Sequence, residues 1–415
     1  MTAFRTRGHP AAVMALATML RGHVPHAILL VGPRGVGKTT LATDVAAGLL
    51  CTDADPAERP CGHCRACRLV ASGGHPDVHR LGPEGVGRQV VIGGPTTPVR
   101  GVRDLIVELS LTPVEGGARV AIVSSAHRMN EDAQAALLKT LEEPSDGVVI
   151  ILCADVEDPI LPTIRSRSAR IRLGPLATRD VEALLTEVGA ADPPQAARLA
   201  RIAGGRPGIA MAWARQPDAV LAREQLARTL LDLTHARPSE RLASMRAVMP
   251  LAVAVAAIDD DQSEALGSGA AEGPATARGK GGGTRRRATA GDDPAEPADD
   301  STVAPARASA AERRRATEAI VAVWTDLARD LVVIGRGMPG AARDIGLLDE
   351  TGAAAADHDP ARVLGFLERL GRATTLLAGN VSPELVLDDL VLAWSRPTPT
   401  PGPTPPPTRR ASATR

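Results

Sequence analysis

The first half of the chain alternates short, mostly apolar runs with stretches whose apolar residues recur at helical spacing. The apolar runs at 27–31, 118–123 and 148–152 have the length of strands buried on both faces. Helical spacing predicts helices at 11–20, 99–109 and 132–143, and one after residue 38 with Ala42, Val45, Ala46 and Leu49 on one face. A further short strand is predicted at 89–92, inside a glycine- and proline-rich stretch.

The second half shows only the helical pattern. Apolar residues recur at helical spacing in four stretches, at 181–202, 215–258, 320–327 and 363–370. Ser382, Pro383 and Glu384 supply a cap, a first-turn proline and an acid for a last helix that ends at Trp394.

Two segments have the composition of disordered chain. Residues 259 to about 311 are mostly Gly, Ala, Pro, Ser and charged, and residues 396–415 form a proline- and threonine-rich tail. Neither can bury enough apolar surface to offset the entropy of ordering. The run 285–287 of three arginines could contact DNA phosphate, although a solvated run of charge is the simpler interpretation.

Composition limits the classes of protein that fit. The 415 residues, 44% of them apolar, are enough for two or three domains. The 48 basic and 48 acidic residues cancel, so a nucleic acid would have to meet a local basic patch. With 3 tryptophans, 2 phenylalanines and no tyrosine, stacking of bases on aromatic platforms is not expected. Finding neither a signal pattern nor an apolar run near eighteen residues, we expect a soluble, cytoplasmic protein without a membrane partner.

Residues Gly32–Thr39 match the phosphate-binding pattern G-x-x-x-x-G-K-[ST] between the first apolar run and a helical pattern, as the motif requires. In such a loop backbone N–H groups surround an anion, the lysine reaches the outer phosphates and the threonine hydroxyl can ligate magnesium. ATP or ADP is the expected ligand, with magnesium left open, and binding does not by itself imply hydrolysis. The predicted nucleotide-binding residues are Gly32, Pro33, Arg34, Gly35, Val36, Gly37, Lys38, Thr39 and Thr40.

Four cysteines are spaced C-x9-C-x2-C-x2-C in a loop with almost no apolar residues of its own. Cys51, Cys61, Cys64 and Cys67 can close a tetrahedral zinc site that would fold this loop. Two disulfides or four free thiols are the alternatives, and a cytoplasmic location disfavours the disulfides. His63, His75 and His79 could each replace one ligand, but solvated loop histidines are the simpler interpretation.

Serines stand where an ATPase of this kind needs acids. The strand at 118–123 ends in Ser124-Ser125, and a hydroxyl can neither carry the charge that holds magnesium nor accept a proton from water. Glu131 and Asp132 follow the predicted helix cap Asn130, so we expect them to face the helix dipole rather than act as displaced catalytic acids. His127 is a candidate base, but a packed or solvent-facing histidine is favoured.

Glu142 and Glu143 end the helix at 132–143, where carboxylates oppose the helix dipole at a cost of about 0.3–1 kcal/mol each. We therefore expect them either to pair with a group such as an arginine on a neighbour or to belong to a solvated face.

Three motifs together resemble the bacterial DNA polymerase III clamp-loader subunits of the AAA+ superfamily. They are the P-loop with its four-cysteine insertion, the helix ending LLKTLEEP at 137–144, and TIRSRS at 163–168. The resemblance covers about residues 5–215 and, more weakly, the C-terminal region. The tau/gamma motor subunits of this family carry an Asp-Glu pair in place of Ser124-Ser125 and a cysteine in place of Ser168, and loss of the acids with retention of the arginine is typical of delta-prime subunits.

The resemblance implies that Arg167 is an arginine finger that reaches into the ATP site of an adjacent motor subunit. A guanidinium offers forked donors to the charge that develops on the γ-phosphate, and such a finger can be worth about 10³–10⁵ in rate. Arg165 and Arg170 compete for the role by position alone. Pro207, next to Arg206, stands where the motor subunits carry a lid arginine that senses the γ-phosphate, so loss of that arginine is expected.

The implied architecture is an α/β P-loop AAA+ core with a parallel sheet over 1–174, carrying the zinc-binding insertion at about 51–67. A small helical lid over 175–214 follows, and then an all-α collar over 215–395, interrupted at about 259–311.

The implied function is that of the delta-prime stator of the clamp loader, which presents Arg167 during ATP-driven loading of the sliding clamp on DNA and has little or no ATPase activity of its own. Implied partners are the tau/gamma and delta subunits, the clamp and primer-template DNA. The alternative is an ATP-hydrolysing tau/gamma motor, favoured by the intact P-loop and disfavoured by Ser124-Ser125. A third hypothesis, a free-standing P-loop kinase, is not supported, because the sequence has no acid in the place where the catalytic base is expected.

Overall fold

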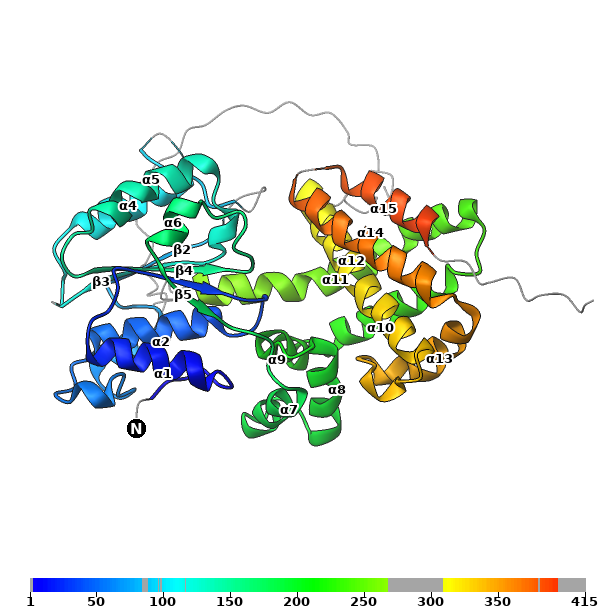
Figure 1. The fold of residues 1–415 in the computed structure, drawn as a ribbon, viewed down its shortest axis with the longest axis horizontal. Helices are drawn as coiled ribbons and strands as arrows, with labels where there is room; N and C mark the ends of the chain where they lie inside the picture. Colours follow the sequence, from blue (N-terminus) through cyan, green and yellow to red (C-terminus); the bar gives the residue numbers. More distant parts are fainter. Residues whose placement is uncertain are drawn as a thin grey trace, which may run out of the picture.

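The computed structural model describes residues 3–83, 89–95, 97, 99–115, 117–267, 309–379 and 381–394. A sheet with helices on both faces forms the N-terminal part, and helices alone form the rest (Figure 1). The tail expected at 396–415 lies outside the described residues, as does most of the segment expected to be disordered. The first nine residues of that segment belong instead to α11 (Pro238–Gly267), and Ser309 caps α12 (Ala310–Gly335).

Five parallel strands form the sheet in the order β2-β3-β4-β1-β5. They are β1 (Ala27–Val31), β2 (Val78–Leu81), β3 (Arg119–Val123), β4 (Val148–Ala154) and β5 (Ala169–Arg172). In the central strand β1, Ile28 and Leu30 join the core on one face and Leu29 joins the core on the other. Burial on both faces explains why the three inner strands are apolar, except for Arg119 at the start of β3. The structure thus has the parallel α/β AAA+-like core predicted from the sequence.

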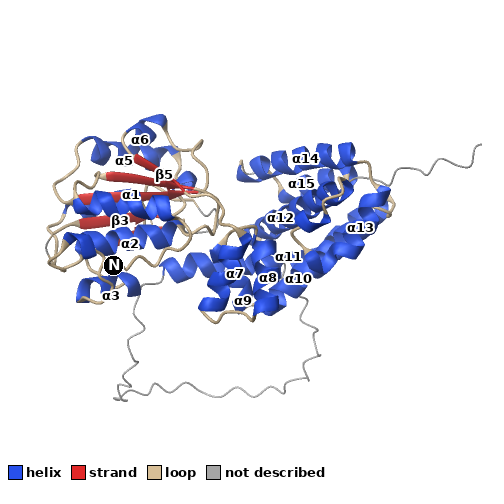
Figure 2. Ribbon diagram, turned by 60° about the horizontal axis from the view of Figure 1, so that its bottom comes forward, coloured by secondary structure: helices blue, strands red, loops and turns tan. Residues whose placement is uncertain are grey.

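Two helical layers cover the sheet. The first layer contains α1 (Pro10–Arg21), α2 (Lys38–Leu50) and α3 (Arg65–Ser72), which share one core with the sheet. The second contains α4 (Val102–Ser110), α5 (Glu131–Glu142) and α6 (Pro162–Ser166), which share the other. Figures 1 and 2 show the two layers on opposite faces of the strands. Since parallel strands end at the same edge, the P-loop after β1 lies beside the residues that follow β4.

The sequence patterns missed several elements, among them two strands and the helices α3 and α6, and wrongly predicted another strand. The strands β2 and β5 lie at the two edges of the sheet and read Val-His-Arg-Leu and Ala-Arg-Ile-Arg, so neither has an apolar run. The short helix α6 between β4 and β5 was also not predicted. The strand predicted at 89–92 is wrong, because this stretch makes only an isolated bridge between Val90 and Met129.

Two helical groups follow the sheet. The segment predicted to be the lid contains α7 (Thr178–Glu187), α8 (Pro193–Ala203) and α9 (Pro207–Arg215), which we name the lid helices. They share a core that also receives Ile258 from α11. The C-terminal helices are α10 (Pro217–Asp232), α11, α12, α13 (Leu348–Asp357), α14 (Pro360–Ala378) and α15 (Pro383–Ala393). Both views place the lid helices between the sheet and the C-terminal helices (Figures 1 and 2). The stretch 215–258, expected to be helical throughout, is divided between α10 and α11.

The core of the C-terminal helices is built around three of the five aromatic residues. The rings of Trp324, Phe366 and Trp394 lie 4.5–5.4 Å apart, centroid to centroid, at angles of 50–68°. Such tilted and edge-on contacts are the favourable geometry for aromatic pairs. Pro383 opens α15 as predicted, but the Ser382 hydroxyl donates to the Glu384 carboxylate at 2.8 Å and caps no backbone N–H.

One segment of the described chain, Pro238–Ile258 of α11, is long and apolar enough to cross a membrane by length and composition, with a mean hydropathy of 1.5. The expectation that no apolar run approaches eighteen residues is therefore wrong for this segment. The core helix of a folded domain passes the same test. Met245, Val248 and Ala252 of α11 are indeed buried against α12 and α15, which is the packing of a core helix.

Candidate functional site

The P-loop runs from the end of β1 into the first turn of α2, as predicted. A side chain at Gly32 would lie 2.0 Å from the Leu173 carbonyl oxygen, so only glycine fits there. Gly35 has a φ of +78°, and its carbonyl accepts the N–H of Gly208 in α9 at 2.8 Å. The start of the lid helix α9 therefore lies directly on the phosphate-binding loop.

Lys38, the lysine of the motif, is turned back into its own loop. Its Nζ donates to the carbonyl oxygens of Gly32 at 2.6 Å and Pro33 at 3.0 Å, and to Oδ1 of Asp155 at 2.7 Å. Only 8% of the lysine side chain is exposed, against 34% of that of Asp155. The ammonium group thus has three internal acceptors, one of them a carboxylate.

Asp155 is a site residue that the sequence patterns did not identify. It follows β4, and β4 pairs with β1, so its carboxylate lies beside the P-loop. Its backbone N–H donates to Nδ1 of His127 at 3.1 Å. Burial lowers the pKa of the His127 imidazole below its ordinary value, and the Asp155 carboxylate opposes that shift only in part. His127 is therefore a packed, neutral acceptor near neutral pH, as favoured from the sequence.

The end of β3 carries hydroxyls where a hydrolytic site needs carboxylates. The backbone N–H and the hydroxyl of Ser124 both donate to the Leu81 carbonyl oxygen, at 2.8 and 3.2 Å. The predicted cap of α5 is confirmed, because Asn130 Oδ1 accepts the N–H of Ala133 at 2.9 Å. Glu131 and Asp132 are exposed in the first turn of α5, where carboxylates favour the positive end of the helix dipole.

Arg167 lies at the C-terminal end of α6, with 37% of its side chain exposed. Its Nη2 lies 2.8 Å from Oε1 of Glu142, and its Nη1 donates to the Thr163 carbonyl oxygen at 3.2 Å. Of the two competing arginines, Arg170 lies 3.9 Å from the Glu157 carboxylate on the edge strand β5. Arg206 precedes α9, which Pro207 opens, and its Nε donates to the carbonyl oxygen of Ala203 at the end of α8, at 2.7 Å.

The four cysteines of the insertion come together in one cluster. The sulfurs of Cys51, Cys61, Cys64 and Cys67 all lie within 4.8 Å of one another. The Sγ atoms of Cys51 and Cys64 are 3.9 Å apart, and all four cysteines are unpaired thiols. Sulfurs bound tetrahedrally to one zinc at about 2.3 Å stand roughly 3.8 Å apart, so the spacing fits a metal and not a disulfide.

Backbone donors also point at the sulfurs of this cluster. The N–H groups of Cys61, Cys64 and Cys67 donate to the Sγ atoms of Cys51, Cys61 and Cys64 at 3.3–3.5 Å. Burial opposes the thiolate form of Cys64, but hydrogen bonds from Cys67 and Thr52 outweigh it and lower the pKa of that thiol to about 6. The donor set therefore suits a bound cation. Cys51, Cys67 and Val70 join the core beside α2, so the insertion has no separate core.

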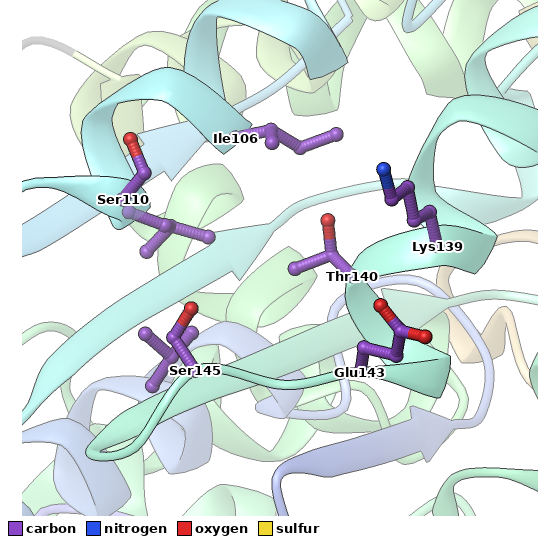
Figure 3. A pocket seen from close by; sticks show the side chains of 8 residues that line it. Ile106, Ser110, Lys139, Thr140, Glu143 and Ser145 are labelled. Carbon is purple, nitrogen blue, oxygen red and sulfur yellow. The ribbon is translucent and has the colours of Figure 1, made fainter.

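A shallow pocket of about 230 Å³ lies elsewhere, between α4 and α5 (Figure 3). Ile106 and Ser110 line it from α4, Lys139 and Glu143 from α5, and Ser145 from the turn before β4. No P-loop residue and no cysteine lines it, so this pocket is separate from both candidate sites.

Comparison with known proteins finds sequences similar to the N-terminal part of this chain. The family model described as "DNA polymerase III, delta subunit" matches residues 8–177. The DNA polymerase III subunit delta' of Pseudomonas aeruginosa is 42% identical over 147 residues, 35% of this chain and 42% of that protein. The DNA polymerase III subunit delta' of Escherichia coli is 36% identical over 211 residues, 51% of this chain and 60% of that protein. The DNA polymerase III subunit tau of Escherichia coli is 33% identical over 204 residues, 48% of this chain and 30% of that protein.

The matched region spans about half the length of the curated delta' relatives. It holds the P-loop, the four-cysteine cluster, Ser124-Ser125 and Arg167. Residues 8–177 therefore match the DNA polymerase III delta' subunit family, which is related to the gamma/tau clamp-loader subunits.

Proposed function

We propose that this chain is the delta' stator of a DNA polymerase III clamp loader and presents Arg167 to the ATP site of a neighbouring motor subunit. The proposal rests on which catalytic groups this chain lacks and which it keeps. The chain has hydroxyls where its own site needs carboxylates, at Ser124-Ser125, yet it keeps an exposed arginine at the end of α6. Such a chain can assist ATP hydrolysis in a neighbouring subunit while hydrolysing little ATP in its own site.

The partners follow from the same proposal. The chain would assemble with gamma/tau and delta subunits in the cytoplasm, and through the assembled complex it would act on the sliding clamp and primer-template DNA. The delta' and tau relatives support this assignment by sequence similarity over 35–51% of this chain.

We further propose a structural zinc ion on Cys51, Cys61, Cys64 and Cys67. The spacing of the four sulfurs and the N–H donors aimed at them support it. With all four positions filled by thiolates, the zinc would hold the insertion against α2 and would supply no open position for catalysis.

The second candidate function is an ATP-hydrolysing motor, favoured by the complete P-loop. ATP hydrolysis by the purified chain, beside its Lys38→Ala variant, separates the two. No turnover above that variant supports the stator. Turnover that Lys38→Ala abolishes would establish the motor and would require an acid outside Ser124-Ser125.

The finger itself is tested in a reconstituted loader. Arg167→Ala should leave assembly intact and lower ATP turnover, because the motor site next to this chain loses its trans donor. Arg165→Ala is the matched control, since it removes the same charge two residues away in α6. Unchanged turnover with Arg167→Ala would refute the stator role of this arginine.

A further inference from the structure

The lysine of the P-loop cannot bind phosphate in the arrangement described here without giving up an ion pair. An ammonium group has three protons to donate. Lys38 directs its donors at two carbonyl oxygens of the loop and at the Asp155 carboxylate, all within 3.0 Å. A phosphate that needs Nζ must therefore displace Asp155 or at least compete with it.

The position of Asp155 is fixed by the sheet and by its backbone. Val31 of β1 is in register with Ala154 of β4, and the N–H of Gly32 donates to the Ala154 carbonyl oxygen at 3.1 Å. The start of the P-loop and the residue before Asp155 are thus tied together. The N–H of Asp155 is held by His127 Nδ1, whose ring is itself largely buried.

We propose that Asp155 sets the nucleotide affinity of this P-loop by acting as the internal counter-ion of Lys38. The ligand class is a nucleoside di- or triphosphate, and the inference rests on the P-loop being a nucleotide site, as in the proposed function. Two effects act in the same direction. The carboxylate occupies the lysine, and its charge repels the phosphates that approach the loop.

The test is nucleotide binding by the full chain, measured with a fluorescent ADP and a fluorescent ATP, each with and without magnesium. Asp155→Asn keeps the size of the side chain and removes its charge, and it should lower the Kd for both nucleotides about tenfold, which corresponds to about 1.4 kcal/mol. Asp155→Ala should act in the same direction if the Asn variant folds poorly. Lys38→Ala should abolish binding.

Asp158→Asn is the matched control, because it removes the same charge from an exposed residue three positions along the same loop. Its Kd should stay within twofold of the parent value. Equal tightening by both variants would mean a general effect of charge and would overturn the assignment to Asp155.

Three other outcomes would also overturn it. Unchanged binding by Asp155→Asn and Asp155→Ala would show that Lys38 is not held back. Weaker binding of the Asn variant only in the presence of magnesium would make Asp155 a metal ligand. No nucleotide binding by the parent or by either Asp155 variant would show that the Lys38–Asp155 ion pair is not what prevents nucleotide binding. None of these outcomes touches the stator role, which is decided by Arg167 in the reconstituted loader.

Discussion

Arg167 and Glu142 form an ion pair within the chain, with Nη2 of the arginine 2.8 Å from Oε1 of the glutamate. The sequence predicted that the carboxylates at the end of α5 either pair with an arginine or face solvent. The arginine that Glu142 uses is the proposed finger itself. With 37% and 49% of the two side chains exposed, the pair is worth only about 0.2–1 kcal/mol, so a phosphate could take the guanidinium from it.

Glu142→Gln is therefore expected to leave ATP turnover of the reconstituted loader unchanged or to raise it by at most about fivefold, because Arg167 no longer has to leave a carboxylate. Glu143→Gln is the matched control, since it changes the adjacent exposed glutamate, which lines the pocket of Figure 3. A fall in turnover like that of Arg167→Ala would mean instead that Glu142 orients the finger.

The sequence predicted the strands that are buried on both faces of the sheet, and it did not predict the edge strands, which are partly exposed. Apart from Arg119 at the start of β3, the strands β1, β3 and β4 are apolar because helices cover both of their faces. The edge strand β5 carries Arg170 and Arg172 on its exposed side, and only Ile171 marks its core side. A single buried residue in four gives no period, so β5 and the equally short β2 could not be predicted.

The candidate sites divide in a similar way. The P-loop and the cysteines were found because their chemistry depends on fixed spacing over a short stretch. Asp155 was missed because its contact with Lys38 spans 117 positions. A usable signal was nonetheless present. Asp155 is the first charged residue after the apolar run of β4, and the carboxyl ends of parallel strands share the edge that binds ligands.

The four-cysteine cluster should contain about one zinc per chain. Metal analysis of the purified protein is expected to find it, and Cys64→Ser should lose the metal and lower the melting temperature. Cys153→Ala is the control, because this cysteine is fully buried in β4, where burial raises the pKa of its thiol to about 12. Purified protein with no zinc and four readily titrated thiols would contradict the site.

Arg241 in α11 should contribute strongly to stability. It is fully buried, and its guanidinium donates to the carbonyl oxygens of Thr234, Ala236 and Trp394 at 2.9–3.0 Å. Arg241→Ala would leave these buried acceptors without that donor, so we expect a loss of about 3 kcal/mol or more in the free energy of unfolding. Thermal unfolding should show a melting temperature lower by several degrees. Arg246→Ala, an exposed change on the same helix, should have little effect.

Glu224 of α10 should make the stability of the protein depend on pH. Its carboxylate joins the lid helices to the C-terminal helices through Arg198 of α8, with Nη2 of the arginine 2.6 Å from Oε2 of the glutamate. The hydrogen bond from Arg198, and then the charges of Arg198 and Arg228, hold the pKa of Glu224 below the ordinary value of 4.5.

A carboxyl group whose pKa is lowered by folding stabilises the protein above its unfolded-state pKa, and that contribution is lost as the pH falls through the folded-state pKa. Glu224→Gln should therefore lower the stability by about 1 kcal/mol at pH 7, measured by thermal unfolding, and by less as the pH falls below about 4. Glu368→Gln, an exposed change on α14, should show no such difference. If Glu224→Gln lowered the stability equally at pH 7 and at a pH below about 4, the shape of the side chain, and not its charge, would link the two helical groups.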